Sequence, residues 1–304
     1  MKSKSKWNLV ICYTTIRNRF LPDSSWIYSS LRTPQTVEYE QLKFDLSEVI
    51  KRRLEKQAYL EEYYSYSTME AFSDSLNRVI HELNAQTNNG KNKETLDSVK
   101  NQVDSLLSIP DSPLFDSSVC PERRGWLFGL ELVPALRTRT GSISNIFPSP
   151  STYVSFEFSF GKGRLLGSAG MSAHLGGFLK SKGAFSYRST FYPENLRCED
   201  ETFFLSIRYL LLDNNYFMTG PFAGIGITMF DVQGTDYPSL FSPHYCAGID
   251  VNFKAFRRWG LPEKRMSELI VKGKLYAMYD NIAGHPGFSF NLGLGLGWAI
   301  YRTK

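Results

Sequence analysis

Six ionisable residues are the strongest candidates for chemistry in this chain of 304 residues. Each lies on the face of its segment opposite the large apolar residues, and three are carboxylates while three are cations. They are Glu131, Glu157, Arg208, Asp250, Lys272 and Lys274. A buried charge is very costly unless it is paired and hydrogen-bonded, so we expect an ion-pair network that acts as a structural plug. Glu131 is expected to reach Lys272 or Lys274, and Glu157 to meet Arg208 or the same lysines.

Cysteine spacing and charge exclude several other kinds of chemistry. Cys12, Cys120, Cys198 and Cys246 show no CxxC spacing, so we expect no zinc site, and we predict no other metal and no cofactor. The formal net charge is +5, but lysines and arginines are scattered among carboxylates, which argues against a nucleic-acid partner. The predicted strands place Cys120 and Cys198 at opposite ends of the fold, so no disulfide is expected between them.

The segment FSFNLGLGLGWAI, residues 288–300, indicates what kind of element positions the charges. A large apolar residue stands at every second position, and Ser, Asn, Gly or Ala fills the positions between, which is the period of a β-strand. In a soluble antiparallel sheet the face opposite the apolar one should carry polar and charged side chains, but here it carries almost only small residues. Small residues suit the crowded interior of a small closed barrel. The large apolar face then points outward, which is tolerable only in lipid.

The same alternation recurs in seven further segments, which gives eight strands, the smallest common size for an outer-membrane barrel. These segments are residues 125–132, 153–161, 165–175, 203–211, 221–230, 245–253 and 271–280. The residues expected to face lipid include Trp126, Phe156, Ile207, Ile227, Val251, Leu294 and Leu296. Phe222 and Phe230 on the predicted inner face, and Gly273 on the outer face, depart from the pattern.

The connections between the predicted strands alternate between long and short. Those after the second and fourth strands, GKGR and DNNY, are short, and those after the first, third, fifth and seventh are longer. Bacterial barrels carry tight turns at the periplasmic end and loops at the outer end. We therefore expect residues 135–150, 176–200, 232–243 and 281–287 to lie outside the cell. The sixth connection, residues 255–267, is longer than this rule prefers.

Residues 125–301 resemble the eight-stranded outer-membrane barrels of the OmpA type and the generic outer-membrane β-barrel domain of Gram-negative bacteria. The closing strand is similar to the C-terminal assembly signal of such barrels, with Gly295, Trp298 and Ile300 at the corresponding positions. The resemblance implies a protein of the bacterial outer membrane with a structural or surface-binding role. It implies outer-membrane lipid and the outer-membrane assembly machinery as partners, and it also implies a lumenal ion-pair network.

The part of the chain before the barrel has a different character. Apolar residues recur at helical spacing in three stretches of residues 36–110, which predicts a small α-helical region in the periplasm that could hold a periplasmic partner. Residues 111–124 are a predicted linker and residues 125–304 the barrel. Residues 1–35 form a poorly defined segment whose basic start and short apolar run could serve as a weak export signal, unless the true start differs.

Two alternatives from other classes stay open at this level. A soluble lipocalin-like barrel would turn its large apolar residues inward around a ligand. A lipid-modifying barrel enzyme would need a His and a Ser near the outer part of the barrel. His174 with Ser172 falls on the inner face, and His244 and His285 lie in or beside outer loops without an orienting carboxylate at a set distance. We predict that the chain is not an enzyme and assign no catalytic residue.

Overall fold

The structure, a computed structural model, describes residues 2–6, 8–13, 18–19, 30, 32–60, 66–110, 122–232, 237–261 and 263–303. The chain divides into two compact units. One consists of Met1–Lys4, Ile11–Val119 and Gly260–Lys264, and its described residues form three α-helices. The other consists of Ser5–Val10, Cys120–Trp259 and Arg265–Lys304, and contains the barrel. Among the described residues, no helix is both long enough and apolar enough to cross a membrane.

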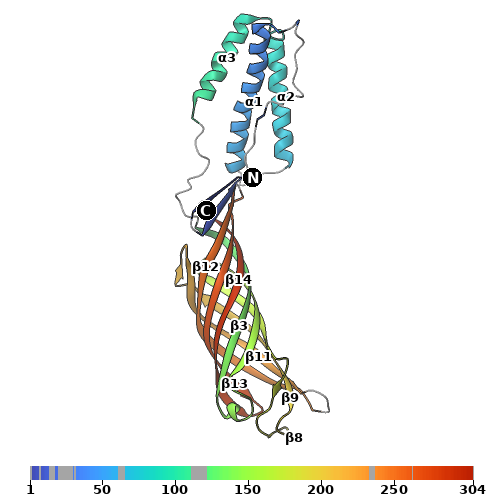
Figure 1. Cartoon of the computed structure of the whole chain (residues 1–304), viewed down its shortest axis with the longest axis vertical. Coiled ribbons are helices and arrows are strands. Elements are labelled where there is room, and N and C mark those ends of the chain that lie inside the picture. The colour runs from blue at the N-terminus through green and yellow to red at the C-terminus, as the bar shows by residue number, and fades with distance from the viewer. Residues whose placement is uncertain are drawn as a thin grey trace. The chain divides into compact units, whose positions relative to one another are not determined.

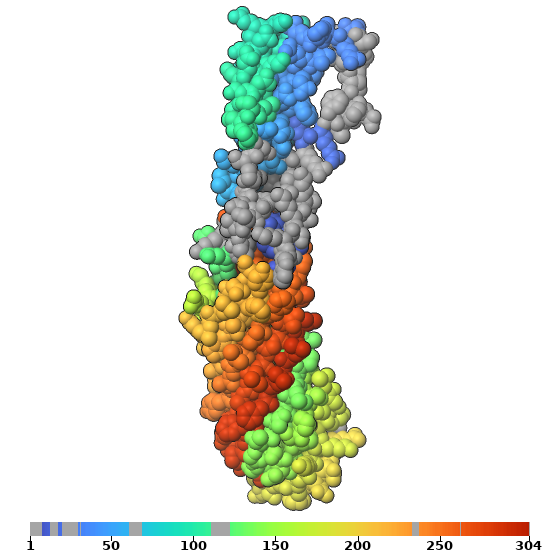
Figure 2. All heavy atoms as spheres, turned by 60° about the vertical axis from the view of Figure 1, so that its left-hand side comes forward, coloured from blue at the N-terminus to red at the C-terminus, as the bar shows by residue number. Residues whose placement is uncertain are grey.

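Eight long strands form the barrel, and each pairs with its neighbours in an antiparallel sense (Figure 1). They are β3 (Arg123–Gly141), β4 (Ser151–Lys162), β5 (Leu165–His174), β9 (Arg197–Tyr209), β11 (Phe217–Val232), β12 (Leu240–Leu261), β13 (Arg265–Ile282) and β14 (His285–Thr303). The last strand pairs with the first, with Leu292 opposite Leu136 and Leu296 opposite Leu132, so the sheet closes on itself. Figure 2 shows β14 in red directly beside β3 in green. The predicted closed barrel of eight antiparallel strands, preceded by a small α-helical region, is confirmed.

The inside and outside of the barrel follow the alternation of the sequence. Leu292, Leu294 and Leu296 on β14 are exposed, while Ser289 and Asn291 between the apolar positions are buried. All seven residues that we expected to face lipid lie on the exposed outer surface. A soluble lipocalin-like barrel requires the opposite phase, so this arrangement argues against it.

Several strands are longer than the sequence pattern predicts. We expected the first loop to begin at residue 135, but β3 continues to Gly141, because Leu136, Thr138 and Thr140 keep the outward phase. The sixth connection is also shorter than expected, since β12 and β13 extend until only residues 262–264 separate them. Polar and charged residues inside a barrel interior resemble loop sequence, which explains both differences.

Short strands and one 3-10 helix lie at the two ends of the barrel. At the end with the longer loops lie η3 (Ser142–Asn145), β6 (Leu179–Lys180), β7 (Phe185–Tyr187) and β8 (Thr190–Tyr192). We call this the loop end. The opposite end, where residues 163 and 164 alone join β4 to β5, is the turn end, and it carries β10 (Leu212–Asp213). Near the turn end Asn8, just before β2 (Leu9–Tyr13), accepts a hydrogen bond at its carbonyl from the Arg257 N–H of β12. The first strand, β1, spans Lys2–Lys6.

The helical unit packs in the opposite manner, with apolar residues inside. Its helices are α1 (Pro34–Leu60), α2 (Tyr66–Gln86) and α3 (Lys93–Ser108) (Figure 1). Leu42, Leu83, Leu96 and Val103 form a buried cluster across all three. The turn between α2 and α3 passes through Gly90 at a φ of +80°, where a Cβ would lie 2.7 Å from Cγ of Tyr39. Glycine is therefore required for the close approach of this turn to α1.

Candidate functional site

The middle of the barrel lumen holds all six of the ionisable residues that the sequence singled out. Lys272 Nζ on β13 pairs with Glu131 on β3, lies 3.4 Å from Glu157 Oε2 and lies 3.5 Å from Asp250 Oδ2. Lys274 Nζ lies 2.6 Å from Glu157 Oε1. The side chain of Lys272 therefore contacts all three carboxylates of this layer.

Arg208 completes the layer from the opposite wall of the barrel. Its guanidinium pairs with the Asp250 carboxylate and lies 3.9 Å from Glu131 Oε2. All six residues are buried. Three cations and three carboxylates leave the layer formally neutral, which is the condition under which charges tolerate a space without bulk water.

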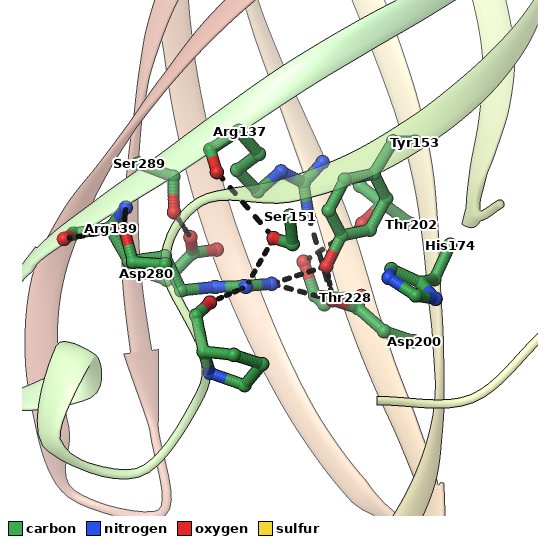
Figure 3. A network of polar contacts seen from close by, with 12 residues as sticks. Arg137, Arg139, Ser151, Tyr153, His174, Asp200, Thr202, Thr228, Asp280 and Ser289 are labelled. Atoms are coloured by element: carbon green, nitrogen blue, oxygen red, sulfur yellow. Dashed lines mark hydrogen bonds and ion pairs between the residues drawn. The ribbon is translucent and has the colours of Figure 1, made fainter. Parts of the chain in front are cut away.

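A second charged layer lies nearer the loop end, and the sequence analysis missed it. Arg139 Nη2 lies 2.7 Å from Asp200 Oδ2 and donates to the hydroxyl of Tyr153 at 2.5 Å (Figure 3). The Tyr153 hydroxyl donates in turn to Asp200. Arg137 stacks on the Tyr153 ring, with its guanidinium carbon 3.8 Å from the ring centroid, and its Nε donates to Asn291. Both arginines lie on the part of β3 that the sequence analysis interpreted as a loop, so the alternation did not predict that their side chains point into the lumen.

A third polar cluster fills the lumen near the turn end. Glu268 on β13 accepts from Arg257 Nε at 2.9 Å and from the Tyr301 hydroxyl at 2.6 Å. Lys254 Nζ lies 3.5 Å from Glu268 and 2.7 Å from Asp213. Polar side chains from the barrel strands thus occupy the lumen in three successive layers.

An apolar cluster closes the loop end above the second charged layer. We call it the apolar cap, and its buried members come from the loops and the strand ends around the barrel mouth. They are Ile143, Ile146, Phe147, Tyr153, Leu179, Phe185, Tyr192, Cys198, Phe230, Val232, Leu240 and Ile282. Phe147 from the first loop stacks on Phe230 at 4.4 Å, and Phe185 stacks on Tyr192 at 4.7 Å between ring centroids. Phe230, which departs from the barrel pattern, points inward because it belongs to this cap.

Arg139 joins the cap to the barrel wall. Its Nη1 donates to the carbonyl of Pro148 in the first loop at 3.2 Å and to the Ser151 hydroxyl at 3.0 Å, while Nη2 bonds to Asp200 on β9. The backbone N–H of Arg139 also donates to the Ser149 hydroxyl at 2.9 Å. One side chain therefore fastens the first loop to a strand on another part of the barrel.

The histidines and cysteines do not combine into a nucleophile and its base among the described residues. His174 Nδ1 accepts from the N–H of Gly176 at 3.1 Å, whereas the hydroxyl of Ser172 makes no hydrogen bond. His244 is buried, and its Nδ1 lies 3.3 Å from the Thr228 hydroxyl. Cys12, Cys198 and Cys246 are buried free thiols, and Cys120 lies outside the described residues. In the described part of the chain, no group of three or more His, Cys, Asp or Glu side chains could hold a metal.

The positions that resemble an assembly signal all lie on β14. Trp298 and Ile300 are exposed on the outer surface. Gly295 faces inward, where a Cβ would lie 2.1 Å from the backbone oxygen of Leu132 on β3. The glycine thus permits a close approach of the closing strand to the first strand.

Comparison with known proteins finds similarity of fold only. No protein-family model and no curated protein sequence matches the chain. Neisserial surface protein A is 10% identical with a TM-score of 0.38, over 59% of this chain and 99% of that one. Ail of Yersinia pestis, solved with the heparin analogue sucrose octasulfate, is 12% identical with a TM-score of 0.32, over 57% and 99%. The outer membrane protease OmpT from Escherichia coli is 10% identical with a TM-score of 0.25, over 62% and 99%.

Proposed function

We propose that this chain is an outer-membrane protein of a Gram-negative bacterium, in which a closed barrel serves as a membrane anchor with a structural or surface-binding role. The observation that carries the proposal is the exposed outer face. On β14 alone, seven large apolar residues at alternating positions, from Phe288 to Ile300, are exposed. A water-exposed patch of this size is rare on soluble monomers, whereas a lipid-facing barrel surface requires it.

The filled lumen supports an anchor over a general porin. Three layers of buried charged side chains occupy the interior, and the apolar cap covers the loop end. A barrel of about eight strands has an interior just wide enough for side chains to fill. We propose that the ion-pair network of the middle layer stabilises this plug, with no part in transport or catalysis.

The proposed topology places the loop end at the cell surface and the turn end in the periplasm. The helical region would then lie in the periplasm and be available to a periplasmic partner. The barrel would be inserted by the outer-membrane assembly machinery, which would recognise Gly295, Trp298 and Ile300 on the closing strand. Surface binding would use the loops between β5 and β9, where Phe178 and Phe191 are exposed.

Membrane fractionation combined with a gel run before and after boiling tests the proposed anchor. A folded membrane barrel resists SDS and shifts in mobility on heating, so we expect the unboiled protein from the outer-membrane fraction to migrate differently from the boiled one. Recovery of the native protein in the soluble fraction, without a heat-dependent shift, would refute a membrane barrel.

Single introduced cysteines test the topology in a background whose native cysteines are replaced by alanine. Ser186 on β7 and Leu212 on β10 are exposed at opposite ends of the barrel. On intact cells, an impermeant thiol reagent should label Ser186→Cys and leave Leu212→Cys unlabelled until the outer membrane is opened. The reverse labelling pattern would overturn the orientation.

Swelling of reconstituted liposomes in small sugars tests the closed lumen. We expect a swelling rate equal to that of protein-free liposomes, because side chains fill the lumen in three layers and the apolar cap covers the loop end. Rapid swelling with the folded protein would contradict the plug and favour a porin.

A further inference from the structure

The outer surface at the turn end carries a row of basic side chains just beyond the apolar band. We call this row the basic belt, and it comprises exposed residues from β3, β4, the β4–β5 turn, β12, β13 and β14. They are Arg124, Lys162, Arg164, Arg258, Arg265 and Arg302. Three carboxylates, Glu122, Asp213 and Glu263, lie at the same end among the described residues, and Asp213 pairs with Arg123 and Lys254, so cations outnumber carboxylates there.

The belt continues the outward phase of the strands. Arg302 follows Ile300 by two positions on β14, Arg124 precedes Trp126 by two on β3, and the same step joins Phe160 to Lys162 on β4. Each of these three strands therefore changes from an apolar to a basic side chain on the same face. That step marks the boundary between hydrocarbon and headgroups, where amphipathic tryptophans such as Trp126 and Trp298 are also enriched.

The strand register places two belt residues directly opposite each other. Arg265 on β13 is the cross-strand partner of Arg302 on β14, and Lys162 on β4 is the partner of Trp126 on β3. Like charges directly opposite each other destabilise a sheet. In the described part of the chain, no ion pair compensates Arg265 or Arg302. An anion from outside the protein would remove this repulsion.

The opposite rim does not share this excess of cations. At the loop end the exposed and half-exposed charges are mixed in sign, with Lys180, Lys182, Arg188 and Arg197 beside Glu194, Glu199, Glu201 and Asp231. A general excess of positive charge over the molecule would not produce this difference. Among the described residues, the excess of cations lies at the turn end.

We propose that the basic belt binds the phosphates of anionic phospholipids in the leaflet that surrounds the turn end. This inference rests on the proposed membrane anchor. Clusters of lysine and arginine near a membrane surface attract anionic lipids by about 1 kcal/mol each, which corresponds to about a five-fold preference for each cation. The planar guanidinium of arginine, which supplies five of the six members, suits bidentate phosphate contacts.

The two exposed tryptophans beside the belt provide a native reporter of the surrounding lipid. Trp126 and Trp298 are exposed on the outer surface, whereas Trp259 is buried. The full chain, with Trp7 and Trp26 replaced by phenylalanine, would be folded into phosphatidylcholine vesicles containing brominated phosphatidylglycerol or, separately, the same fraction of brominated phosphatidylcholine. We expect brominated phosphatidylglycerol to quench more strongly, and the excess to fall as salt is added.

Two double variants, each of which removes two positive charges, show whether the preference for the anionic lipid arises at the turn end. Arg265→Gln with Arg302→Gln should lower the quenching preference several-fold, up to about five-fold for each cation removed. Lys180→Gln with Arg197→Gln, at the loop end, should leave it unchanged. Equal quenching by the two lipids in the parent protein, or an equal loss in both double variants, would overturn the belt.

Failure of the belt and failure of the anchor are distinguishable in the same samples. A parent protein that shows the heat-dependent gel shift in pure phosphatidylcholine vesicles is a folded membrane barrel, and equal quenching then refutes the belt alone. A parent protein that never shows the shift in any vesicle refutes the anchor, and the belt with it.

Discussion

The barrel and the helical unit place their side chains in opposite ways. The helical unit buries Leu42, Leu83 and Leu96 and exposes charges such as Glu40 and Glu70, as a water-soluble bundle does. The barrel buries Glu157 and Lys272 and exposes leucines along β14. The two units thus bury opposite kinds of side chain, because we propose that water surrounds the helical unit and lipid surrounds the barrel. Apolar side chains avoid water in one unit, and in the other charged side chains avoid lipid.

The largest expected effect comes from a charge buried in the barrel. Lys272→Met should leave three carboxylates without a shared cation and cost on the order of 3–5 kcal/mol of unfolding free energy. Adding Glu131→Gln should recover part of that loss, since the two side chains are paired. Urea unfolding of the folded protein in detergent would measure both values.

Lys180→Met provides the matched control for this cycle, because Lys180 is exposed at the loop end. Its cost should stay within about 0.5 kcal/mol. A second cycle on Lys274 and Glu157 should also show coupling, since their charged groups lie 2.6 Å apart. Zero coupling in both cycles would mean that the network contributes nothing to stability.

The same substitution on the two exposed surfaces tests whether they face different solvents. Leu294→Arg on the barrel should cost roughly 2–4 kcal/mol if the site lies near the bilayer midplane. Leu106→Arg on the surface of α3, where the leucine is also exposed, should change stability by about 0.5 kcal/mol or less. The measurement is the unfolding free energy of each variant in lipid vesicles. Equal, small effects would place both surfaces in water.

Two glycines on the inner face of the barrel should respond differently to a methyl group. A Cβ on Gly295 would meet the Leu132 carbonyl oxygen at 2.1 Å, whereas a Cβ on Gly129 would lie 3.4 Å from its nearest neighbour, the Trp298 carbonyl oxygen. Gly295→Ala should therefore cost about 1–3 kcal/mol and Gly129→Ala much less. Gly295→Ser should be costly for the same reason, because its Cβ would meet the same carbonyl oxygen. The fraction of heat-shifted protein after refolding would rank the two variants.

The smallest effect concerns an ion pair on the surface of the helical unit. The hydrogen bond from Lys100 lowers the pKa of Glu38 below its ordinary value of 4.5, and Glu38 raises the pKa of Lys100 above 10.5. The stabilisation by Glu38 is therefore present above pH 4.5 and is lost as the pH falls through the lowered value. For Lys100 it is present below pH 10.5 and is lost as the pH rises through the raised value.

Glu38→Gln should accordingly lower the helix melting temperature slightly at pH 7 and leave it unchanged in strong acid, measured by circular dichroism of the full chain. The effect at pH 7 should be near the limit of detection, because surface ion pairs contribute little. A pH-independent difference would assign it to packing instead of charge.

The sequence by itself determined which way the barrel side chains face. An alternation of large apolar and small residues has only one phase on a strand, so it placed Glu131, Lys272 and their companions on the inner surface. This facing is a local property, because it is read within a single strand. The recurrence of the alternation in eight segments predicted the strand number.

Only the tertiary structure decided which charges meet and where the strands end. Lys272 pairs with Glu131, and Arg208 pairs with Asp250. Which charges pair depends on the register of strands that are up to 141 residues apart in the sequence. The sequence around Arg137 and Arg139 resembles a loop. The pairing of β3 with β4 and β14 nevertheless extends the strand to Gly141. The apolar cap likewise gathers Phe147 and Phe185 from two separate connections and Phe230 from the end of β11. Contacts of this kind depend on the closure of the whole barrel, and no single segment encodes them.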